Sequence, residues 1–239
     1  MVISSTDNQK YKFISKLKQK KFRDKENTFI IESKKLVEEA LSSADVDFIF
    51  LSEDNIDYKT DKQKVIFSNA LFEKLTGMVS TDGFGAVVKK KESKPLSSAR
   101  VLLLDQINDP GNMGTIIRSC EAFGYNDVIL TSGTVDIYNE KTLRASMGSI
   151  FRLNFIYMSY EEIKTLKNSY KMVAADMSGY DINECEINED LILAIGNEAN
   201  GLSDDIRSLT DTFVKIPMQG QIESLNAAIA ASIIMNKLS

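Results

Sequence analysis

The sequence predicts an α/β protein whose second part is a mostly parallel, doubly wound sheet. Short apolar runs alternate along the chain with amphipathic stretches at helical spacing, which is typical of strands that alternate with helices. Residues 101–105 and 191–195 are apolar almost throughout, as expected of parallel strands that are covered on both faces. Residues 89–98 are charged and polar and contain a proline, so they form the one convincing linker and divide the chain in two.

The part before the linker has the pattern of a small α/β domain, which we assign to residues 1–90. Short runs rich in β-branched and aromatic residues predict four strands, at residues 29–32, 48–51, 65–67 and 83–88. Helical spacing predicts three helices, at residues 7–22, 33–43 and 69–75. Ser33 stands where its hydroxyl can accept from the free N–H groups of the second helix, so we expect it to cap that helix.

The part after the linker contains more elements, and we assign it to residues 99–239, with the linker itself at 91–98. Apolar runs predict six strands, at residues 101–105, 127–131, 151–158, 172–175, 191–195 and 213–216. The segments between and after them predict four helices, at residues 112–123, 139–147, 160–168 and 225–238. Ser224 is the expected cap of the last helix.

The distribution of charge, more than its total, points to a phosphate-binding surface. The formal net charge of the 239 residues is −5, which alone argues against a nucleic-acid partner. Residues 10–25, however, contain eight basic groups and one acid, which leaves −12 for the rest of the chain. The alternative is a solvated surface helix, but the aromatic residues between the lysines favour RNA contact. The side chains expected to contact RNA are Lys16, Lys18, Lys20, Lys21 and Arg23.

Composition excludes several kinds of site. The chain has no histidine and two cysteines, so it offers neither a zinc site nor a disulfide framework, and we expect no bound metal. Any proton transfer must use carboxylates, Lys, Tyr, Arg or water. No apolar run approaches the length that spans a bilayer, and the N-terminal residues lack the apolar core of a secretory signal, so we expect a cytoplasmic protein with no membrane partner.

Polar side chains follow the apolar strands near the end of the chain. Asn197 and Glu198 come directly after the strand at 191–195, and Ser224 and Asn226 precede the last helix. In open α/β sheets ligands bind beyond the carboxyl ends of the strands, so these side chains predict a small-molecule pocket. The alternative that the pattern leaves open is an ordinary sheet edge packed against a terminal helix.

Four segments together resemble the motifs of a known enzyme family. They read NDPGNMGTIIRS at 108–119, LAIGNEANGLS at 193–203, VKIPM at 214–218 and IESLNAAIAAS at 222–232. In order and spacing they are similar to the SpoU (TrmH-like) RNA ribose 2′-O-methyltransferases of the SPOUT superfamily. Residues 1–90 resemble, more loosely, the L30e-like substrate-binding domain that many members carry. The resemblance implies a C-terminal trefoil knot, S-adenosylmethionine as methyl donor, an RNA substrate and a homodimer.

The resemblance also implies roles for individual residues. Backbone groups near Gly196, Ile216 and Leu225 are expected to hold S-adenosylmethionine, with Met218 in the same apolar wall. The residues expected at the reaction centre are Asn112, Arg118, Glu198, Ser224 and Asn226. Asn112 and Arg118 are separated by about 600° of helical rotation, so they need not serve one atom. A structural ion pair with a carboxylate is the alternative role of Arg118.

The function that these expectations support is 2′-O-methylation of a ribose in structured RNA, ribosomal rather than transfer RNA. The sulfonium methyl group is already electrophilic, so the site needs only to position the 2′-hydroxyl and help remove its proton. A guanidinium is not deprotonated in proteins, so Arg118 is expected to hold the neighbouring phosphate, while the proton leaves to water, a phosphate oxygen or Glu198. A non-catalytic RNA-binding module is the alternative. A nicotinamide-dependent oxidoreductase lacks its glycine fingerprint here.

Overall fold

The structure is a computed structural model of the 239-residue chain, and it describes residues 1–77, 81–220 and 224–239. Residues 222 and 223, which open the last of the four motifs, lie outside the described residues. The contacts within the chain divide it into two compact units, residues 1–92 with 138–151 and residues 93–137 with 152–239. Residues 138–151 belong to the first unit, so the two units are not the same as the predicted domains. The domain limits 1–90 and 99–239 therefore stay a prediction.

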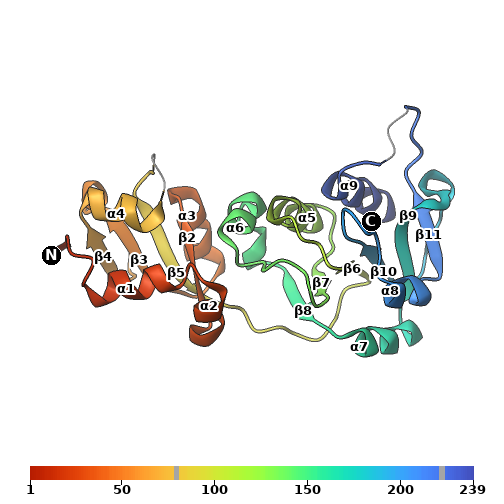
Figure 1. Ribbon diagram of the computed structural model, residues 1–239, viewed down its shortest axis with the longest axis horizontal. Helices are drawn as coiled ribbons and strands as arrows, with labels where there is room; N and C mark the ends of the chain where they lie inside the picture. The colour runs from red at the N-terminus through yellow and green to blue at the C-terminus, as the bar shows by residue number, and fades with distance from the viewer. Residues whose placement is uncertain (78–80, 221–223) are drawn as a thin grey trace. The chain divides into compact units, whose positions relative to one another are not determined.

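The first unit is built on a five-stranded mixed sheet in the order β1-β4-β3-β5-β2 (Figure 1). Its strands are β1 (Val2–Ile3), β2 (Thr28–Glu32), β3 (Val46–Ser52), β4 (Lys64–Phe67) and β5 (Phe84–Lys89). β5 runs antiparallel to β2 and β3, whereas β4 runs parallel to β1 and β3. The four predicted strands are confirmed. β1 was not predicted, because two residues are too few to show a period.

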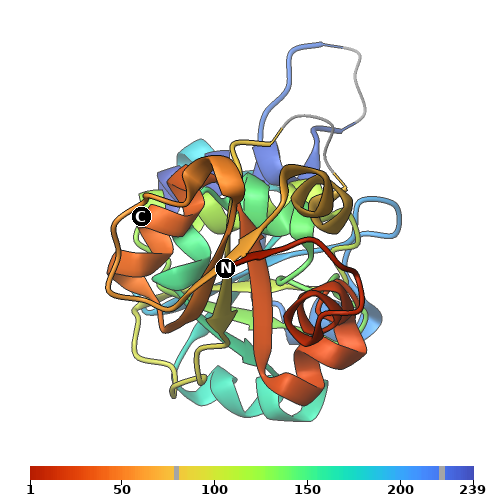
Figure 2. The same ribbon diagram turned by 90° about the vertical axis from the view of Figure 1, so that its left-hand side faces the viewer.

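Helices cover both faces of this sheet. They are α1 (Gln9–Lys16), α2 (Lys20–Glu26), α3 (Lys34–Ser43), α4 (Asn69–Thr76) and α6 (Glu140–Ser146), with short 3-10 turns at Glu53–Asn55 and Ser149–Phe151. α1 and α4 pack over Phe48, Phe50 and Phe67, and α3 lies on the opposite face (Figure 2). Ser33 caps α3 as predicted, because its hydroxyl accepts from the backbone N–H of Leu36. The backbone of Ser33 itself has a positive φ of 95°.

The predicted single helix over residues 7–22 is wrong, because the chain turns between α1 and α2. Arg23 explains where the break falls. Its guanidinium donates to the carbonyl oxygens of Leu17 (2.9 Å) and Lys18 (2.8 Å), which have left the helical pattern at the end of α1. Arg23 is only 6% exposed. This burial argues against the expected contact with RNA, because the charge of Arg23 serves the turn inside the protein.

The second unit contains a six-stranded sheet in the order β11-β9-β10-β6-β7-β8, and all five pairs are parallel. Its strands are β6 (Arg100–Leu104), β7 (Asp127–Leu130), β8 (Asn154–Tyr157), β9 (Lys171–Asp181), β10 (Leu191–Ile195) and β11 (Thr212–Lys215). The predicted parallel α/β sheet is confirmed. β10 occupies the centre, between β6 and β9, and is buried along its whole length, which explains why residues 191–195 are uniformly apolar.

The helices of this unit lie on both faces of the sheet. They are α5 (Pro110–Ala122), α7 (Tyr160–Thr165), α8 (Asp204–Leu209) and α9 (Ala227–Leu238), with 3-10 turns at Leu166–Asn168 and Ile182–Glu184. α5 packs against α9 on one face, and α7 lies beside α8 on the other (Figure 1). The hydroxyls of Ser119 and Ser232, 2.7 Å apart, join α5 to α9. No helix in the described ranges is long and apolar enough to cross a membrane.

Parts of the sequence prediction for this unit differ from the structure. The strand expected at 151–158 begins only at Asn154, because the residues before it form a 3-10 turn. β9 continues six residues beyond the predicted 172–175, and its later part pairs with β11 after a shift in register. α8 was not predicted at all. Its six residues are too few for a helical period, although Ser203 caps it by accepting from Ile206 N (3.4 Å).

Candidate cofactor pocket and active site

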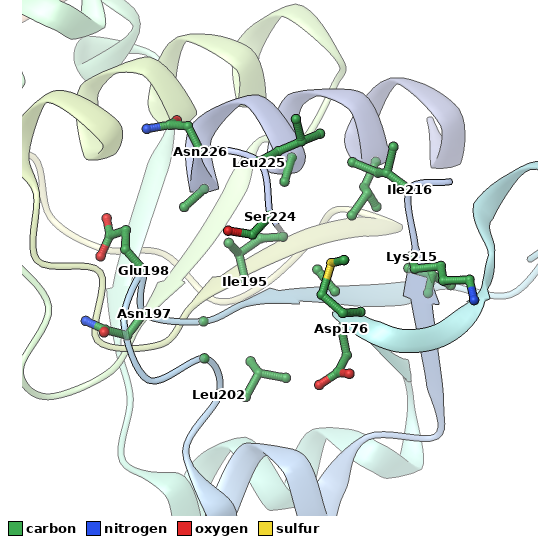
Figure 3. A pocket seen from close by; sticks show the side chains of 18 of the residues that line it. Asp176, Ile195, Asn197, Glu198, Leu202, Lys215, Ile216, Ser224, Leu225 and Asn226 are labelled. Carbon is green, nitrogen blue, oxygen red and sulfur yellow. The ribbon is translucent and has the colours of Figure 1, made fainter. Parts of the chain in front are cut away.

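A pocket of about 480 Å³ lies beyond the carboxyl ends of the central strands of the second unit (Figure 3). Its lining residues come from the middle of β9, from the ends of β10 and β11, from the loops that follow these two strands, and from α9. The residues predicted from the C-terminal motifs all line it: Gly196, Ile216, Met218, Leu225, Glu198, Ser224 and Asn226. Strands far apart in the sequence thus bring these segments to one place, as the rule for parallel sheets predicts.

The loop after β10 folds tightly back on itself. Asn197 and Gly201 exchange two backbone hydrogen bonds, each of 2.9 Å, and the Asn197 side chain accepts from the backbone N–H groups of Ala199 and Asn200. A Cβ on Gly196 would lie 2.4 Å from the carbonyl carbon of Gly201. Glycine is therefore required here by the loop's own backbone, which crosses directly over it. This is a requirement of the fold, separate from the expectation that backbone groups near Gly196 hold the cofactor.

A row of three polar side chains stands at one side of the pocket. Asn226 Nδ2 donates to Asn112 Oδ1 (2.9 Å), and Asn112 Nδ2 donates to Glu198 Oε1 (2.9 Å). These residues come from the start of α9, the first turn of α5 and the loop after β10. The structure thus brings three of the predicted reaction-centre residues into one hydrogen-bonded row, in which the amide of Asn112 fixes the orientation of the carboxylate of Glu198.

Asn226, not Ser224, caps the last helix. Asn226 Oδ1 accepts from the backbone N–H groups of Ala228 (2.9 Å) and Ile229 (3.3 Å), and α9 begins one residue later. The predicted cap at Ser224 and helix start at 225 are therefore wrong. The physical reason is that asparagine caps as well as serine does and stands closer to the helical segment. Ser224 is exposed and lines the pocket.

Arg118 lies apart from this row. It is exposed on α5, it does not line the pocket, and it makes no hydrogen bond or ion pair with the residues that the structure describes. The alternative of a structural pair with a carboxylate is not realised among the residues of this chain that the structure describes. Another arginine of this unit, Arg152, does form such a pair: its Nε and Nη2 donate to the two carboxylate oxygens of Glu121.

Two residues of the pocket were not singled out from the sequence. Asp176, in the middle of β9, and Lys215, at the end of β11, line its far side (Figure 3). Asp176 pairs with Arg207 (2.6 Å). The hydroxyl of Ser178, together with its backbone N–H and Arg207, holds the pKa of Asp176 below its usual range. The length of β9, which carries Asp176 into the pocket, is the signal that sequence reasoning missed.

The lysines predicted to contact RNA lie together in the first unit. Lys16, Lys18, Lys20 and Lys21 are all exposed around the turn between α1 and α2. Lys20 pairs with Asp24 at 2.6 Å, and Lys16 and Lys21 lie over the ring of Phe22, 5.8 and 5.0 Å from its centroid. Three of the four charges therefore have no carboxylate partner among the described residues, and an aromatic ring stands between two of them.

The pocket's chemistry suits S-adenosylmethionine. Ile195, Leu202, Ile216, Leu225 and Ile234 form apolar walls for a flat base. The backbone of the tight loop after β10 also lines the pocket, at Gly196, Asn197 and Gly201. Within the described residues there is no group of three or more His, Cys, Asp and Glu side chains that could hold a metal ion. The residues present thus fit an uncharged adenine with a polar tail, which is the chemistry of a nucleoside cofactor.

Comparisons with known proteins agree with this geometry. Residues 99–236 match the SpoU rRNA Methylase family, and residues 8–86 match the MRM3-like substrate binding domain. The chain is 36% identical over 243 residues to the 23S rRNA (guanosine(2553)-2'-O)-methyltransferase RlmP of Bacillus subtilis. This match covers 99% of this chain and 98% of that protein.

Two solved structures that contain the cofactor AdoMet are similar along nearly the whole chain. One is an rRNA methyltransferase from Sinorhizobium meliloti, with 26% identity and a TM-score of 0.88, covering 99% of this chain and 96% of that one. The other is the SpoU methyltransferase AviRb from Streptomyces viridochromogenes, with 25% identity and a TM-score of 0.86, covering 96% of each chain. The resemblance drawn from the motifs is confirmed, and the chain belongs to the SpoU rRNA methylase family.

Proposed function

We propose that this protein transfers the methyl group of S-adenosylmethionine to the 2′-oxygen of a ribose in 23S ribosomal RNA. The observation that carries the proposal is the junction of an apolar, nucleoside-sized pocket with the row Asn226–Asn112–Glu198 at its side. Guanosine is the first candidate nucleoside, because RlmP, a relative that matches along nearly the whole chain, is named for a guanosine of 23S rRNA.

S-adenosylmethionine supplies an electrophilic methyl group, so the protein's part is to position the acceptor and receive its proton. Glu198 is exposed at the pocket, and one of its oxygens accepts from Asn112. We assign the other oxygen to hold the proton of the incoming 2′-hydroxyl, directly or through water. Asn112 and Asn226 then keep that carboxylate aimed at the same point during transfer. Ser224, exposed in the pocket wall, is assigned to the acceptor's polar edge.

Arg118 requires a second chain in this account. It lies outside the pocket of its own chain and has no partner in the described ranges, whereas a guanidinium close to the acceptor phosphate would stabilise the charge that develops there. The face of α9 beside α5 carries Ile229, 51% exposed, and Ile233, 40% exposed, one turn apart. We propose a homodimer that covers this apolar face and brings Arg118 to the partner's pocket.

A mixed dimer tests that assignment. One chain carries Arg118→Ala with its pocket intact, and the other carries Gly196→Glu with Arg118 intact. If Arg118 acts across the interface, the mixed dimer contains one complete site and regains up to about half of the wild-type activity, since one of two sites is restored. If Arg118 serves its own chain, neither site is complete and mixing restores nothing. A mixed Arg118→Ala, Arg118→Lys dimer controls for subunit exchange.

Two further parts of the proposal concern the fold and its surroundings. We also propose a C-terminal trefoil knot, which the family resemblance implies. The first unit, with its exposed lysines, is proposed to hold the RNA, so that the residues 1–90 and 99–239 divide the work between substrate and cofactor. An rRNA substrate would place the reaction in the cytoplasm.

Incubation with S-adenosylmethionine carrying a labelled methyl group and with undermethylated 23S rRNA tests the function directly. We expect the label in a 2′-O-methylnucleoside after enzymatic digestion of the RNA. Binding of S-adenosylmethionine and of RNA without transfer would instead support a non-catalytic RNA-binding module. Label in a methylated base would overturn the ribose assignment.

A further inference from the structure

Asp105 is a fully buried carboxylate to which the proposed reaction gives no catalytic role. It follows β6 at the carboxyl end of the sheet and is 0% exposed. No lysine or arginine pairs with it in the part of the chain that the structure describes. A buried carboxylate without a cation is costly, and it persists where hydrogen bonds hold it. The contacts of Asp105 therefore indicate what it is retained for.

Those contacts point at the cofactor loop. Asp105 Oδ2 accepts from the backbone N–H of Ser203 at 2.7 Å, and this is the shortest of its bonds. Oδ1 accepts from the hydroxyls of Thr131 (3.0 Å) and Tyr160 (3.2 Å), which fix the carboxylate from the other side. Ser203 directly follows Gly201 and Leu202, two residues that line the pocket. The carboxylate thus holds the far end of the loop that forms one wall of the pocket.

Gln106 holds the near end of the same loop. Its carbonyl oxygen accepts from Asn197 Nδ2 (2.8 Å), its N–H donates to Thr131 Oγ1 (3.1 Å), and its side chain donates to Tyr160 Oη (3.0 Å). Gln106 adopts a positive φ of 57°, a strained conformation for a residue with a side chain. Such strain persists where surrounding contacts over-determine the backbone, and it gathers at functional sites.

We infer that Asp105 is a positioning residue for the cofactor: through the bond to Ser203 it keeps the 197–203 loop in the shape that receives S-adenosylmethionine. The inference rests on the proposed function and adds a residue that touches neither cofactor nor substrate. Without the carboxylate, the loop populates other conformations, and cofactor binding must select the competent one. Apparent affinity then falls in proportion to the population that is lost.

The chain contains a matched control. Asp127 is also a buried carboxylate, 2% exposed, and it also accepts three hydrogen bonds, from the N–H groups of Ser97 and Ser98 and from Asn154 Nδ2. It stands at the start of β7, at the amino end of the sheet and opposite to the pocket. Replacing Asp127 thus removes a buried carboxylate with a similar number of hydrogen bonds, while the loop that lines the pocket keeps its contacts.

The test measures binding of S-adenosylhomocysteine, the demethylated product, to the full chain by titration calorimetry. Asp105→Ala should weaken binding by about tenfold or more, the effect of losing one hydrogen bond to a charged group. Asp127→Ala should bind within about twofold of wild type, although both variants lower the unfolding temperature. In turnover, Asp105→Ala should raise KM for S-adenosylmethionine more than it lowers kcat. Equal weakening in both variants, or none in Asp105→Ala, overturns the inference.

A second measurement covers the case in which the alanine variants do not fold. In Asp105→Asn the amide oxygen can still accept from the hydroxyls of Thr131 and Tyr160, so the core is better preserved, while its Nδ2 faces the N–H of Ser203 and cannot accept from it. Amide hydrogen exchange over 197–203 should be faster in Asp105→Asn than in Asp127→Asn, and equal exchange would refute the link to the loop. If wild type binds neither cofactor nor product, the proposed function fails, while the exchange experiment still decides the role of Asp105 in holding the loop.

Discussion

Replacing Asn112 with aspartate changes the row at the pocket by a single atom. In the wild type, Asn112 Nδ2 donates to Glu198 Oε1 at 2.9 Å and Asn112 Oδ1 accepts from Asn226. Asn112→Asp keeps the bond from Asn226 but turns the donor toward Glu198 into an acceptor. Two carboxylate oxygens would then face each other across the distance that now holds a hydrogen bond, so Glu198 should turn away from the acceptor's position.

The magnitude follows from the geometry. Two unit charges 2.9 Å apart repel by about 1.4 kcal/mol in water and by about 6 kcal/mol at an effective dielectric constant of 20. Glu198 is exposed and Asn112 half-buried, so the lower figure applies. The lost hydrogen bond to a charged group adds about 1 kcal/mol after a discount for exposure. A total of about 2–3 kcal/mol corresponds to a decrease of roughly 30-fold to 150-fold in kcat/KM.

Steady-state methyl transfer from S-adenosylmethionine to 23S rRNA is the assay, with two controls. Asn112→Ala removes both hydrogen bonds without repulsion, so it should lose about tenfold at most and keep the pH profile of wild type. Asn236→Asp adds the same charge at an exposed position of α9, and it measures any general effect on RNA binding. Asn112→Asp should recover part of its activity toward about pH 5, where one proton shared by two carboxylates restores the bond. Equal activity of the aspartate and alanine variants at every pH would refute the reasoning.

Three further predictions test other parts of the molecule. Replacing Lys16, Lys18, Lys20 and Lys21 by glutamine should make the slope of log K for RNA binding against log salt concentration shallower, by about 0.7–0.9 per lost phosphate contact. The control variant Lys59→Gln, Lys62→Gln changes two lysines that are exposed elsewhere and should leave the slope unchanged. An unaltered slope in the fourfold variant would exclude the lysines around the turn between α1 and α2 as the RNA-binding surface. Gly196→Ala places a methyl group 2.4 Å from the backbone of Gly201 and should abolish binding of S-adenosylhomocysteine. Gly220→Ala should not affect binding, because a Cβ at Gly220 has no atom within 4 Å. Normal binding by Gly196→Ala would show that the loop is not part of the site. Burial alone would raise the pKa of Asp127, but the hydrogen bonds from Asn154, Ser97 and Ser98 hold that pKa below its usual range. Its ionised form therefore stabilises the fold above about pH 4, and this contribution is lost as the pH falls through the folded pKa. The unfolding temperature of Asp127→Asn should decrease less than that of wild type between about pH 6 and about pH 3, and parallel decreases would contradict the assignment.

The strands were predictable from the sequence because burial on two faces leaves a strong local signal. β10 matches its predicted residues 191–195 at both ends, since every side chain in it is apolar and a glycine follows. Short elements left no such signal. β1 contains two residues and α8 six, fewer than a pattern needs to repeat. The helical break before α2 was missed because it depends on Arg23 reaching back to two carbonyl groups, a contact that periodicity does not encode.

The site divides in the same way. The motif residues of the C-terminal loops were predictable as a set, because parallel strands carry their following loops to one edge of the sheet. Which of them would be joined was not predictable. Asn226 serves both as the cap of α9 and as the donor to Asn112, and the sequence alone favoured Ser224 for the cap. Asp105 gave no motif signal, because its role is visible only once Ser203, 98 residues away, lies within hydrogen-bond distance.

The central claim is that the acceptor atom is a ribose 2′-oxygen, and one measurement tests it most directly. An rRNA fragment that contains the target nucleotide is prepared in two forms, with ribose and with 2′-deoxyribose at that position only. Transfer of the labelled methyl group from S-adenosylmethionine is followed on both fragments, with their binding measured in parallel. The account predicts transfer to the ribose form and none to the deoxy form, with similar binding of the two. Continued methylation of the deoxy fragment would contradict it.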